Sequence, residues 1–404
     1  MTTPFKRPAD TYSPLYFLAS LGAGGLSVTF FMFLFFWVPH PNQPVPVFED
    51  IWAAFSQGML PLQAAILIAW AGIAVFAFLN VKYLLWNLSA LSAFKKTEAY
   101  TTLRNSNAET TLLAGPLAAA MTINALFIVG MAFVPMLWTI VEYLFPMAMV
   151  AFGLVGLWAL RLIGDFLGRV LSQGGLFDVT AHNSFAQLLP AFAISMVGVG
   201  FAAPAAMSTT PATVAIALVI STFFAVAAVI YTLLAAATAF ASMLHYGTHK
   251  EAGPTLMVIV PIVTILSILF LRQEHGLHVT FGVHGAEGET MIFLARMLSV
   301  QVVFLALGLL VMRRQGYFAD FVLGPKTSPG SYALVCPGVA FAVLMHFFIN
   351  KGLVASGAID KFGVAFWILT AIAIASQVLM IALVIRLNRQ HFGKPALPEA
   401  VPAE

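Results

Sequence analysis

The sequence predicts an all-α integral membrane protein with ten transmembrane helices, and three observations lead to this class. Of the 404 residues, 61% are hydrophobic and only 9% are charged, whereas a soluble protein of this length has roughly a quarter charged residues. Apolar stretches of membrane-crossing length recur along the whole chain. The basic residues concentrate in alternate connecting segments. The high pI therefore indicates basic cytoplasmic loops, and no nucleic-acid partner is predicted.

A helix needs about 20 apolar residues to cross a bilayer. The stretches of about that length are Leu15–Val38, Leu62–Leu85, Ala114–Trp138, Glu142–Asp165, Phe185–Ala206, Ala212–Leu234, Pro254–Leu271, Met291–Met312, Ser331–Ile349 and Phe362–Ile385. The segments between them are too short for a soluble domain. We therefore expect one transmembrane domain over residues 1–404, with cytoplasmic tails at 1–13 and 388–404. No small-residue cleavage pattern follows the first stretch, so we expect it to be retained.

The distribution of basic residues predicts that both termini are cytoplasmic. With the N-terminus inside, the cytoplasmic segments hold fifteen of the nineteen Lys and Arg residues. The other side keeps only Arg272, Arg296, Lys351 and Lys361. This bias is the pattern that sets the orientation of membrane proteins, and it agrees with an even number of helices.

Proline and glycine separate the odd-numbered helices from the even-numbered ones. The third, fifth, seventh and ninth helices are expected to carry helix-breaking prolines at Pro116 and Pro135, Pro190, Pro261 and Pro337. The first has glycines instead. A proline within a helix leaves a carbonyl without its bond, and in lipid that group needs a protein or water partner. We therefore expect five bent inner helices, five outer helices facing lipid, and an arrangement as five helical hairpins.

The predicted spans of the odd-numbered helices contain no Asp, Glu, Lys or Arg. A proton-coupled pump normally needs a buried ionisable relay, whereas a passive path can use backbone dipoles, hydroxyls and amides. The polar candidates for lining such a path are Thr122, Asn124, Gln187, Ser195, Thr264 and Ser267. Each could equally form a helix–helix hydrogen bond. On the fourth helix, Arg161 and Asp165 share a face and are expected to pair.

The histidines do not predict a cofactor. A bis-histidine haem needs facing imidazoles in the middle of the membrane, but only His346 lies within a predicted helix. His275, His278 and His284 lie within ten residues of one another on the outer side and are chemically suited to Zn or Cu. Their spacing matches no strong motif, so they are only weak metal candidates.

The chain has one cysteine, Cys336, which rules out an intrachain disulfide. It lies in the run Ser331-Tyr332-Ala333-Leu334-Val335-Cys336-Pro337-Gly338 that opens the ninth helix. A lone cysteine is often a small core residue. The start of a helix favours thiol reactivity, while burial in lipid opposes it.

Ten helices, cytoplasmic termini and five bent helices together resemble the tellurite-resistance/dicarboxylate transporter superfamily, which includes TehA and the plant slow-type anion channels. The resemblance implies five helical hairpins around a central pore, a trimer, and a location in a bacterial inner membrane. Family members carry a pore-plugging Phe before a proline of the ninth helix, and Cys336-Pro337 stands at that place. Pro190 is similar to the proline of the family's fifth helix. The run ending in Cys-Pro-Gly also resembles the TsoY group, in which cysteine or selenocysteine takes this position.

We therefore expect a membrane channel or facilitator for a small anion or weakly acidic solute, rather than an enzyme. Its path would be lined by helices 1, 3, 5, 7 and 9, with Cys336 and Pro337 as gate candidates and Phe341 as a further bulky group. Two alternatives remain. One is a thiol-dependent membrane redox or sulfur-handling protein that uses Cys336. The other is a membrane anchor for a quinone-linked complex.

Overall fold

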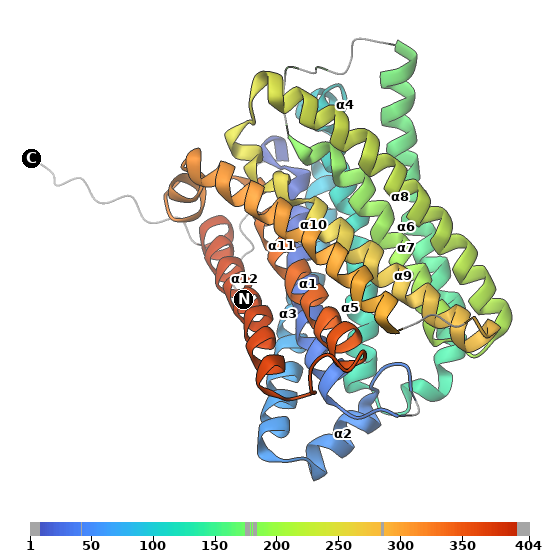
Figure 1. Ribbon diagram of the computed structural model, residues 1–404. Coiled ribbons are helices and arrows are strands. Elements are labelled where there is room, and N and C mark those ends of the chain that lie inside the picture. Colours follow the sequence, from blue (N-terminus) through green and yellow to red (C-terminus); the bar gives the residue numbers. More distant parts are fainter. Residues whose placement is uncertain are drawn as a thin grey trace, which may run out of the picture.

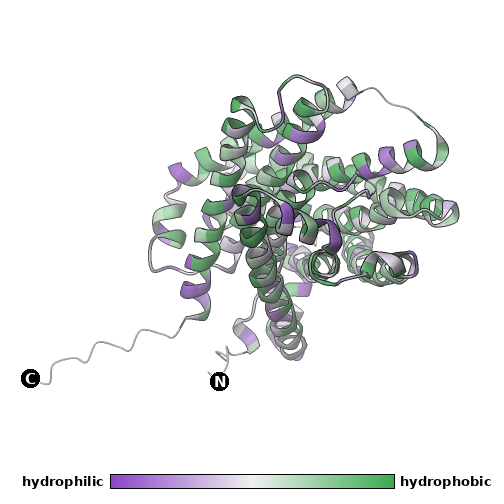
Figure 2. Cartoon of the chain, turned by 90° about the horizontal axis from the view of Figure 1, so that it is seen from below, coloured by the Kyte–Doolittle hydropathy of each residue, from purple (hydrophilic) through white to green (hydrophobic). Residues whose placement is uncertain are grey.

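The chain folds into a bundle of helices. The computed structural model describes residues 9–41, 43–173, 178, 180, 184–283 and 287–393, and the regular elements of this part of the chain are all helical. Ten of its helical segments are long and apolar enough to cross a membrane, which confirms the predicted number and suggests a multi-pass membrane protein. Hydrophobic residues predominate along the helices in the view from below (Figure 2).

The α-helices of the described residues are α1 (Phe17–Trp37), α2 (Phe48–Gln57), α3 (Leu60–Phe94), α4 (Glu98–Arg104), α5 (Ala114–Phe133), α6 (Val141–Gln173), α7 (Leu189–Met207), α8 (Pro211–Tyr246), α9 (Ile259–Phe281), α10 (Glu287–Arg314), α11 (Val335–Phe347) and α12 (Val364–Phe392). Two of them, α2 and α4, were not predicted. Both are too short to appear in a search for apolar stretches of about 20 residues.

Burial alternates along the chain as the proline and glycine pattern predicted. In the first, third, fifth, seventh and ninth spans, 67% to 94% of the most apolar window is buried inside the protein. In the other five spans the share is only 17% to 39%. We call α1, α5, α7, α9 and α11 the inner helices, and α3, α6, α8, α10 and α12 the outer helices. The outer helices expose large apolar side chains such as Phe78, Leu154 and Val219.

The inner helices contact one another in a closed cycle. Helix α1 packs on α5, α5 on α7, α7 on α9, α9 on α11, and α11 on α1. Each outer helix packs on the inner helix that precedes it in the chain, so that α3 lies on α1 and α12 on α11. In Figure 1, α1 and α11 lie near the middle of the bundle, while α12 and α8 lie at opposite flanks. The inner helices therefore have little surface left to expose.

A 3-10 turn precedes the α-helical part of every inner span. The five turns are η2 (Pro14–Tyr16), η3 (Asn107–Leu113), η5 (Phe185–Leu188), η6 (Lys250–Met257) and η8 (Pro329–Leu334). A serine stands immediately before four of them, at Ser13, Ser106, Ser184 and Ser328. The first three of these hydroxyls accept a hydrogen bond from the backbone N–H two residues later. Neighbouring turns contact one another in the same cyclic order as the helices, so all five inner helices start at the same end of the bundle.

Four prolines of the inner helices lie at the junctions between 3-10 turn and α-helix, whereas Pro204 lies inside α7. Pro116, Pro261 and Pro337 are the third residues of α5, α9 and α11, and Pro190 is the second residue of α7. The prediction that they break the helices from within is therefore wrong for these four. A proline in the first turn removes an N–H that has no intrahelical partner. Pro135 lies beyond the end of α5.

Both predicted tails include folded residues. Helix α12 continues to Phe392, so residues 388–392 belong to it. The hydroxyl of Tyr332 donates to Asn388 Oδ1 at 2.9 Å, and Tyr12 is buried against the bundle with its hydroxyl 2.9 Å from Asn87 Oδ1.

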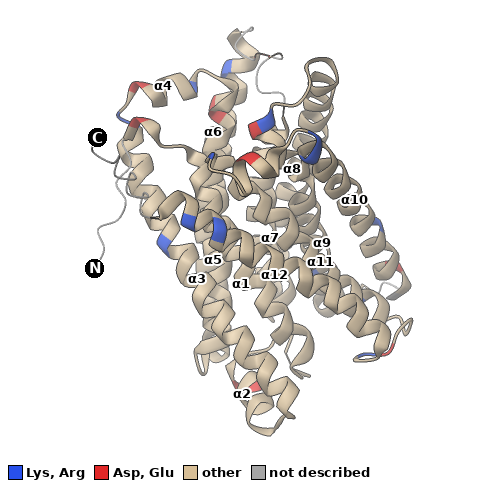
Figure 3. Cartoon of the chain, turned by 90° about the vertical axis from the view of Figure 1, so that its left-hand side faces the viewer, with Lys and Arg blue, Asp and Glu red and all other residues tan. Residues whose placement is uncertain are grey.

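Figure 3 shows Lys and Arg residues gathered toward the end of the bundle that carries α4, opposite the end with α2.

Candidate functional site

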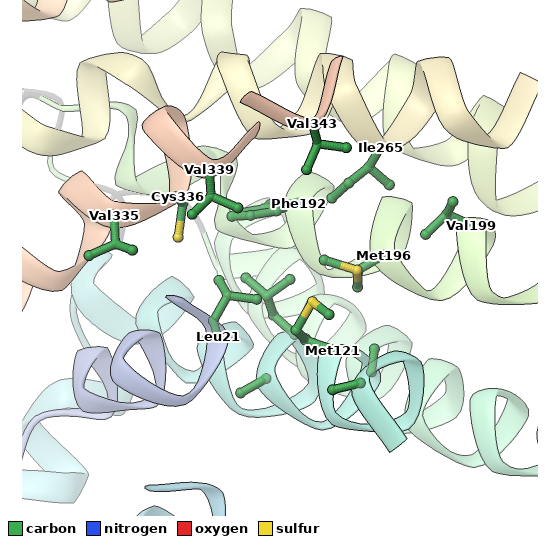
Figure 4. Close-up of a cluster of buried hydrophobic side chains, with 14 of the residues drawn as sticks. Leu21, Met121, Phe192, Met196, Val199, Ile265, Val335, Cys336, Val339 and Val343 are labelled. Atoms are coloured by element: carbon green, nitrogen blue, oxygen red, sulfur yellow. The ribbon is translucent and has the colours of Figure 1, made fainter. Parts of the chain in front are cut away.

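A large cavity of about 570 Å³ lies between the inner helices. All five of them border it, and most of the bordering side chains are apolar. Figure 4 shows Leu21 of α1, Met121 of α5, Met196 of α7, Ile265 of α9 and Val343 of α11 around this space. Gly22 and Gly25 of α1 border this cavity. Their lack of a side chain lets Val335 and Val339 of α11 pack closely against α1.

A second, smaller cavity of about 250 Å³ lies at the end where the inner helices begin. Residues from all five 3-10 turns or from the residues just before them border it. This border is more polar in residue type than that of the large cavity, and includes Ser13, Asn107, Ser184, Gln187 and Thr255. The small cavity is therefore a vestibule formed by the turns and their flanking residues.

The two cavities meet at three side chains. Phe192 of α7, Pro261 of α9 and Cys336 of α11 border both of them. Each lies in the first turn of its helix, just after the 3-10 turn. Phe192 is 3% exposed and Cys336 is 8% exposed, and Figure 4 places both between the inner helices. We call these three residues the constriction, because they are the boundary that the two cavities share.

Most of the residues predicted from the sequence to line a path do border a cavity. Asn124 and Thr264 border the large cavity, Gln187 and Pro337 the small one, and Cys336 both. Ser195, Ser267, Phe341 and Thr122 border neither cavity. The hydroxyls of Ser195, Ser267 and Thr122 donate to carbonyls of their own helices, those of Phe192, Val263 and Ala118. Phe341 is partly buried against the hydrophobic core.

The two predicted polar side chains that border the large cavity, Thr264 and Asn124, differ in how they are held. Thr264 donates to the carbonyls of Val260 and Ala340, and its hydroxyl accepts a hydrogen bond from Gln301 of α10. Asn124 Nδ2 donates to the carbonyl of Ala120 at 3.1 Å and contacts Met196 Sδ at 3.8 Å. Its carbonyl oxygen has no hydrogen-bond partner among the described residues, so it remains available to a solute.

Charged residues border the far end of the large cavity. Arg272, Glu274 and Lys351 lie there together with His275 and His278. The predicted seventh helix ended at Leu271, whereas α9 continues to Phe281, so Arg272 belongs to an inner helix. The sequence did place these residues on one side of the membrane, but it gave no sign that Arg272 and Lys351 share a cavity.

Arg272 contradicts the expectation that the inner spans carry no charge, and a second contradiction lies at the start of the third span. Glu109 lies in η3 of the third span and is 3% exposed. Its carboxylate bonds Arg104 of α4 at 2.8 Å and also Arg169 of α6. Asp165 lies 3.4 Å from Arg104, which replaces the predicted pair of Asp165 with Arg161. These ion pairs tie two short elements to α6.

The histidine cluster lies partly outside the part of the chain that can be described. His275 and His278 border the large cavity, and His284 lies outside the described residues. Within the described ranges, no group of three or more His, Cys, Asp or Glu side chains is close enough to hold a metal ion.

Neither protein-family models nor curated proteins give a match to this chain.

Proposed function

We propose that the protein is a membrane channel or facilitator for a small anion or weakly acidic solute, with its path along the axis of the inner helices. One observation carries this proposal. The two cavities lie within the same cycle of five helices and meet at the constriction of Phe192, Pro261 and Cys336. A solute would cross from the vestibule of 3-10 turns to the large cavity by passing these side chains.

The residues around the path favour passive movement over pumping. The three constriction residues include no carboxylate and no histidine. Among the described residues, the carboxylates and histidines that border the cavities are Glu251, Glu274, His249, His275 and His278, and each borders only one cavity. A proton-coupled mechanism normally needs an ionisable relay in the membrane. The backbone groups of the five 3-10 turns and the amide of Asn124 would instead replace part of the hydration shell of the solute.

We also propose membership of the tellurite-resistance/dicarboxylate transporter superfamily, with five helical hairpins around a central pore, cytoplasmic termini and a trimeric assembly. The packing of each outer helix on the preceding inner helix supports the hairpins. Cys336 then stands where the family has its gating Phe. Phe192, which faces the same boundary from α7, would supply the missing aromatic ring from another helix.

The test is anion flux into proteoliposomes that contain purified wild-type protein, Cys336→Ala or Cys336→Phe. We expect flux to survive the alanine substitution and to fall with phenylalanine, because the larger ring would close the shared boundary. Leu379→Phe is the matched control, since Leu379 lies on the exposed face of α12. Absence of flux with every small anion tested would overturn the channel.

One observation favours the alternative of thiol chemistry. Cys336 borders both cavities, so a small reagent could reach its sulfur from either side. The chain offers no second cysteine, so an external thiol would have to resolve any disulfide formed. Fast labelling by a small water-soluble thiol reagent, without any anion flux, would support this alternative. Flux that persists in Cys336→Ala would contradict it.

A further inference from the structure

Arg272 occupies an unusual position for a basic residue in a membrane protein. It lies on the inner helix α9, borders the large cavity and is partly buried. Its Nη1 donates to the carbonyl of Val199 on α7 at 2.8 Å. A guanidinium has five N–H donors in a rigid plane, so this single bond fixes the group and leaves most of its donors free to bind something else.

The described carboxylates do not neutralise Arg272. The ion pairs of the described residues involve Arg104, Arg169, Lys250 and Lys326, and none involves Arg272 or Lys351. Glu274 borders the same cavity but is exposed. A partly buried cation without a counter-charge is costly in an apolar setting, and a bound anion would remove that cost.

Two other carboxylates near this end of the bundle already have partners. Glu142 accepts hydrogen bonds from the hydroxyls of Ser208, Thr209 and Thr210 and from the backbone N–H of Thr209. Glu49 accepts a bond from the backbone N–H of Met136 at 2.7 Å. Both carboxylates are therefore used to hold connecting segments.

We propose that Arg272 is the main binding group of an anion site in the large cavity, with Lys351 as a second positive charge, and that the ligand is a small monovalent oxyanion. The planar guanidinium can bind two oxygens of such an ion side by side, and the cavity bordered by Arg272 and Lys351 measures about 570 Å³, which leaves space for it. The apolar remainder of the border strengthens the attraction by excluding water. This inference rests on the proposed function, because it names the solute class that the path would take.

The first experiment measures binding without transport. Purified protein in lipid nanodiscs is titrated with chloride, and protein-dependent broadening of the ³⁵Cl NMR line is recorded with and without competing nitrate. In the wild type we expect the broadening to saturate as chloride is added. Nitrate should suppress this broadening at a concentration lower than the chloride concentration that saturates it. Arg272→Gln should weaken nitrate competition by at least about tenfold, because bonds to a charged donor are replaced by bonds to a neutral amide.

The matched control is Arg296→Gln. Arg296 lies on the exposed face of α10 and borders neither cavity, so its substitution should leave nitrate binding as in the wild type. Equal binding by Arg272→Gln and the wild type would overturn the site. An equal loss of nitrate binding in Arg272→Gln and Arg296→Gln would also overturn the site.

Arg272 could instead serve only to join α9 to α7, and Arg272→Gln could fail to fold. Two further variants keep the proposal testable. Arg272→Lys retains the charge without the planar fork, so it should still bind anions but with a smaller preference for nitrate over chloride. Lys351→Gln removes a charge that has no ion pair among the described residues, and should weaken nitrate binding without lowering the melting temperature. If neither variant alters binding, Arg272 is a structural tie only.

Flux assays on the same proteins separate this inference from the proposed function. Nitrate binding that depends on Arg272, in a protein without flux, would keep the site and overturn the channel. Normal nitrate flux in Arg272→Gln, together with unchanged binding, would keep the channel and overturn the site.

Discussion

At the scale of single residues, the boundary between the two cavities depends on bulk rather than on charge. Phe192 contributes the largest side chain of the constriction, and Cys336 and Pro261 complete it. A phenylalanine facing a cysteine closes a path less tightly than two aromatic rings would. The size of the residues at these positions is therefore expected to set the rate of solute movement.

Phe192→Ala should raise anion flux in proteoliposomes, because it removes the aromatic ring at the constriction. Truncation of a buried phenylalanine also costs about 3–5 kcal/mol of stability where a cavity is left, so a control is needed. Phe201 lies on the same helix, is equally buried at 3% exposure and borders neither cavity. Phe201→Ala should lower the melting temperature without raising flux. Equal flux in wild type and Phe192→Ala would remove Phe192 from the gate.

Asp320 gives a pH-dependent contribution to stability. Hydrogen bonds from Lys326 and Lys250 lower the pKa of its carboxyl below the ordinary value of 3.8. Because the pKa is lower in the folded protein, the ionised carboxylate stabilises the fold above the ordinary pKa, and this contribution is lost as the pH falls through the lower, folded-state pKa. Asp320→Asn should therefore lower the melting temperature at pH 7. The difference from the wild type should shrink toward pH 3, and a difference that is constant with pH would contradict this reading.

At the scale of elements, the junction of 3-10 turn and α-helix is the repeated unit of the inner spans. At Ser184 and Pro190, a serine caps the 3-10 turn and a proline lies in the first turn of the α-helix that follows. The serine satisfies a backbone N–H that would otherwise lack a partner at a helix start. The proline fits there because its missing N–H breaks no helical bond.

Ser184→Ala should lower the free energy of unfolding by about 1 kcal/mol, since it removes the bond from Ser184 Oγ to the N–H of Ala186. Ser328 offers a matched control. It is also buried and precedes a 3-10 turn, but its side chain makes no capping bond. Chemical denaturation of both variants in the same detergent tests the difference. A larger loss in Ser328→Ala would show that burial, and not capping, decides the cost.

Gly276 sets the distance between α9 and α7. A Cβ added at this position would lie 2.2 Å from the backbone carbonyl oxygen of Ala205, which cannot move aside as a side chain would. Gly276→Ala should therefore lower the free energy of unfolding by about 1–3 kcal/mol. Gly164 on α6 has open space around it, so Gly164→Ala should be neutral or stabilising. Thermal unfolding followed by circular dichroism compares the two. A neutral Gly276→Ala would mean that the helices can separate at little cost.

At the scale of the whole molecule, the proposed orientation makes a prediction about accessibility. Single cysteines are introduced at Lys96 and Gln57 in a Cys336→Ala background, since both positions are exposed. Lys96 lies just after the end of α3, which the basic residues assign to the cytoplasm, and Gln57 ends α2, just before the start of α3, which they assign to the outside. A membrane-impermeant maleimide added to intact cells should label the cysteine at 57 and not the one at 96. Labelling at 96 alone would reverse the orientation.

Several features follow from the sequence alone. Ten membrane-crossing helices and the alternation of buried and exposed helices could both be predicted, because apolar length and the placement of proline and glycine are local properties. Cys336 and Asn124 could be picked as cavity residues because few polar or nucleophilic side chains occur in the inner spans. A serine precedes four of the 3-10 turns, but one shared residue in four segments is too weak a signal to reveal a repeat before the turns are known.

Other features depend on how distant segments pack. The closed cycle of inner helices brings Phe192, Pro261 and Cys336 to one boundary and Arg272 and Lys351 to one cavity. The members of both groups are far apart in the sequence. Composition and periodicity specify which residues favour lipid, but they do not specify how the helices are rotated about their axes. Side-chain packing sets that rotation, and it decides that Asn124 borders the cavity while Ser195, equally apt by sequence, does not.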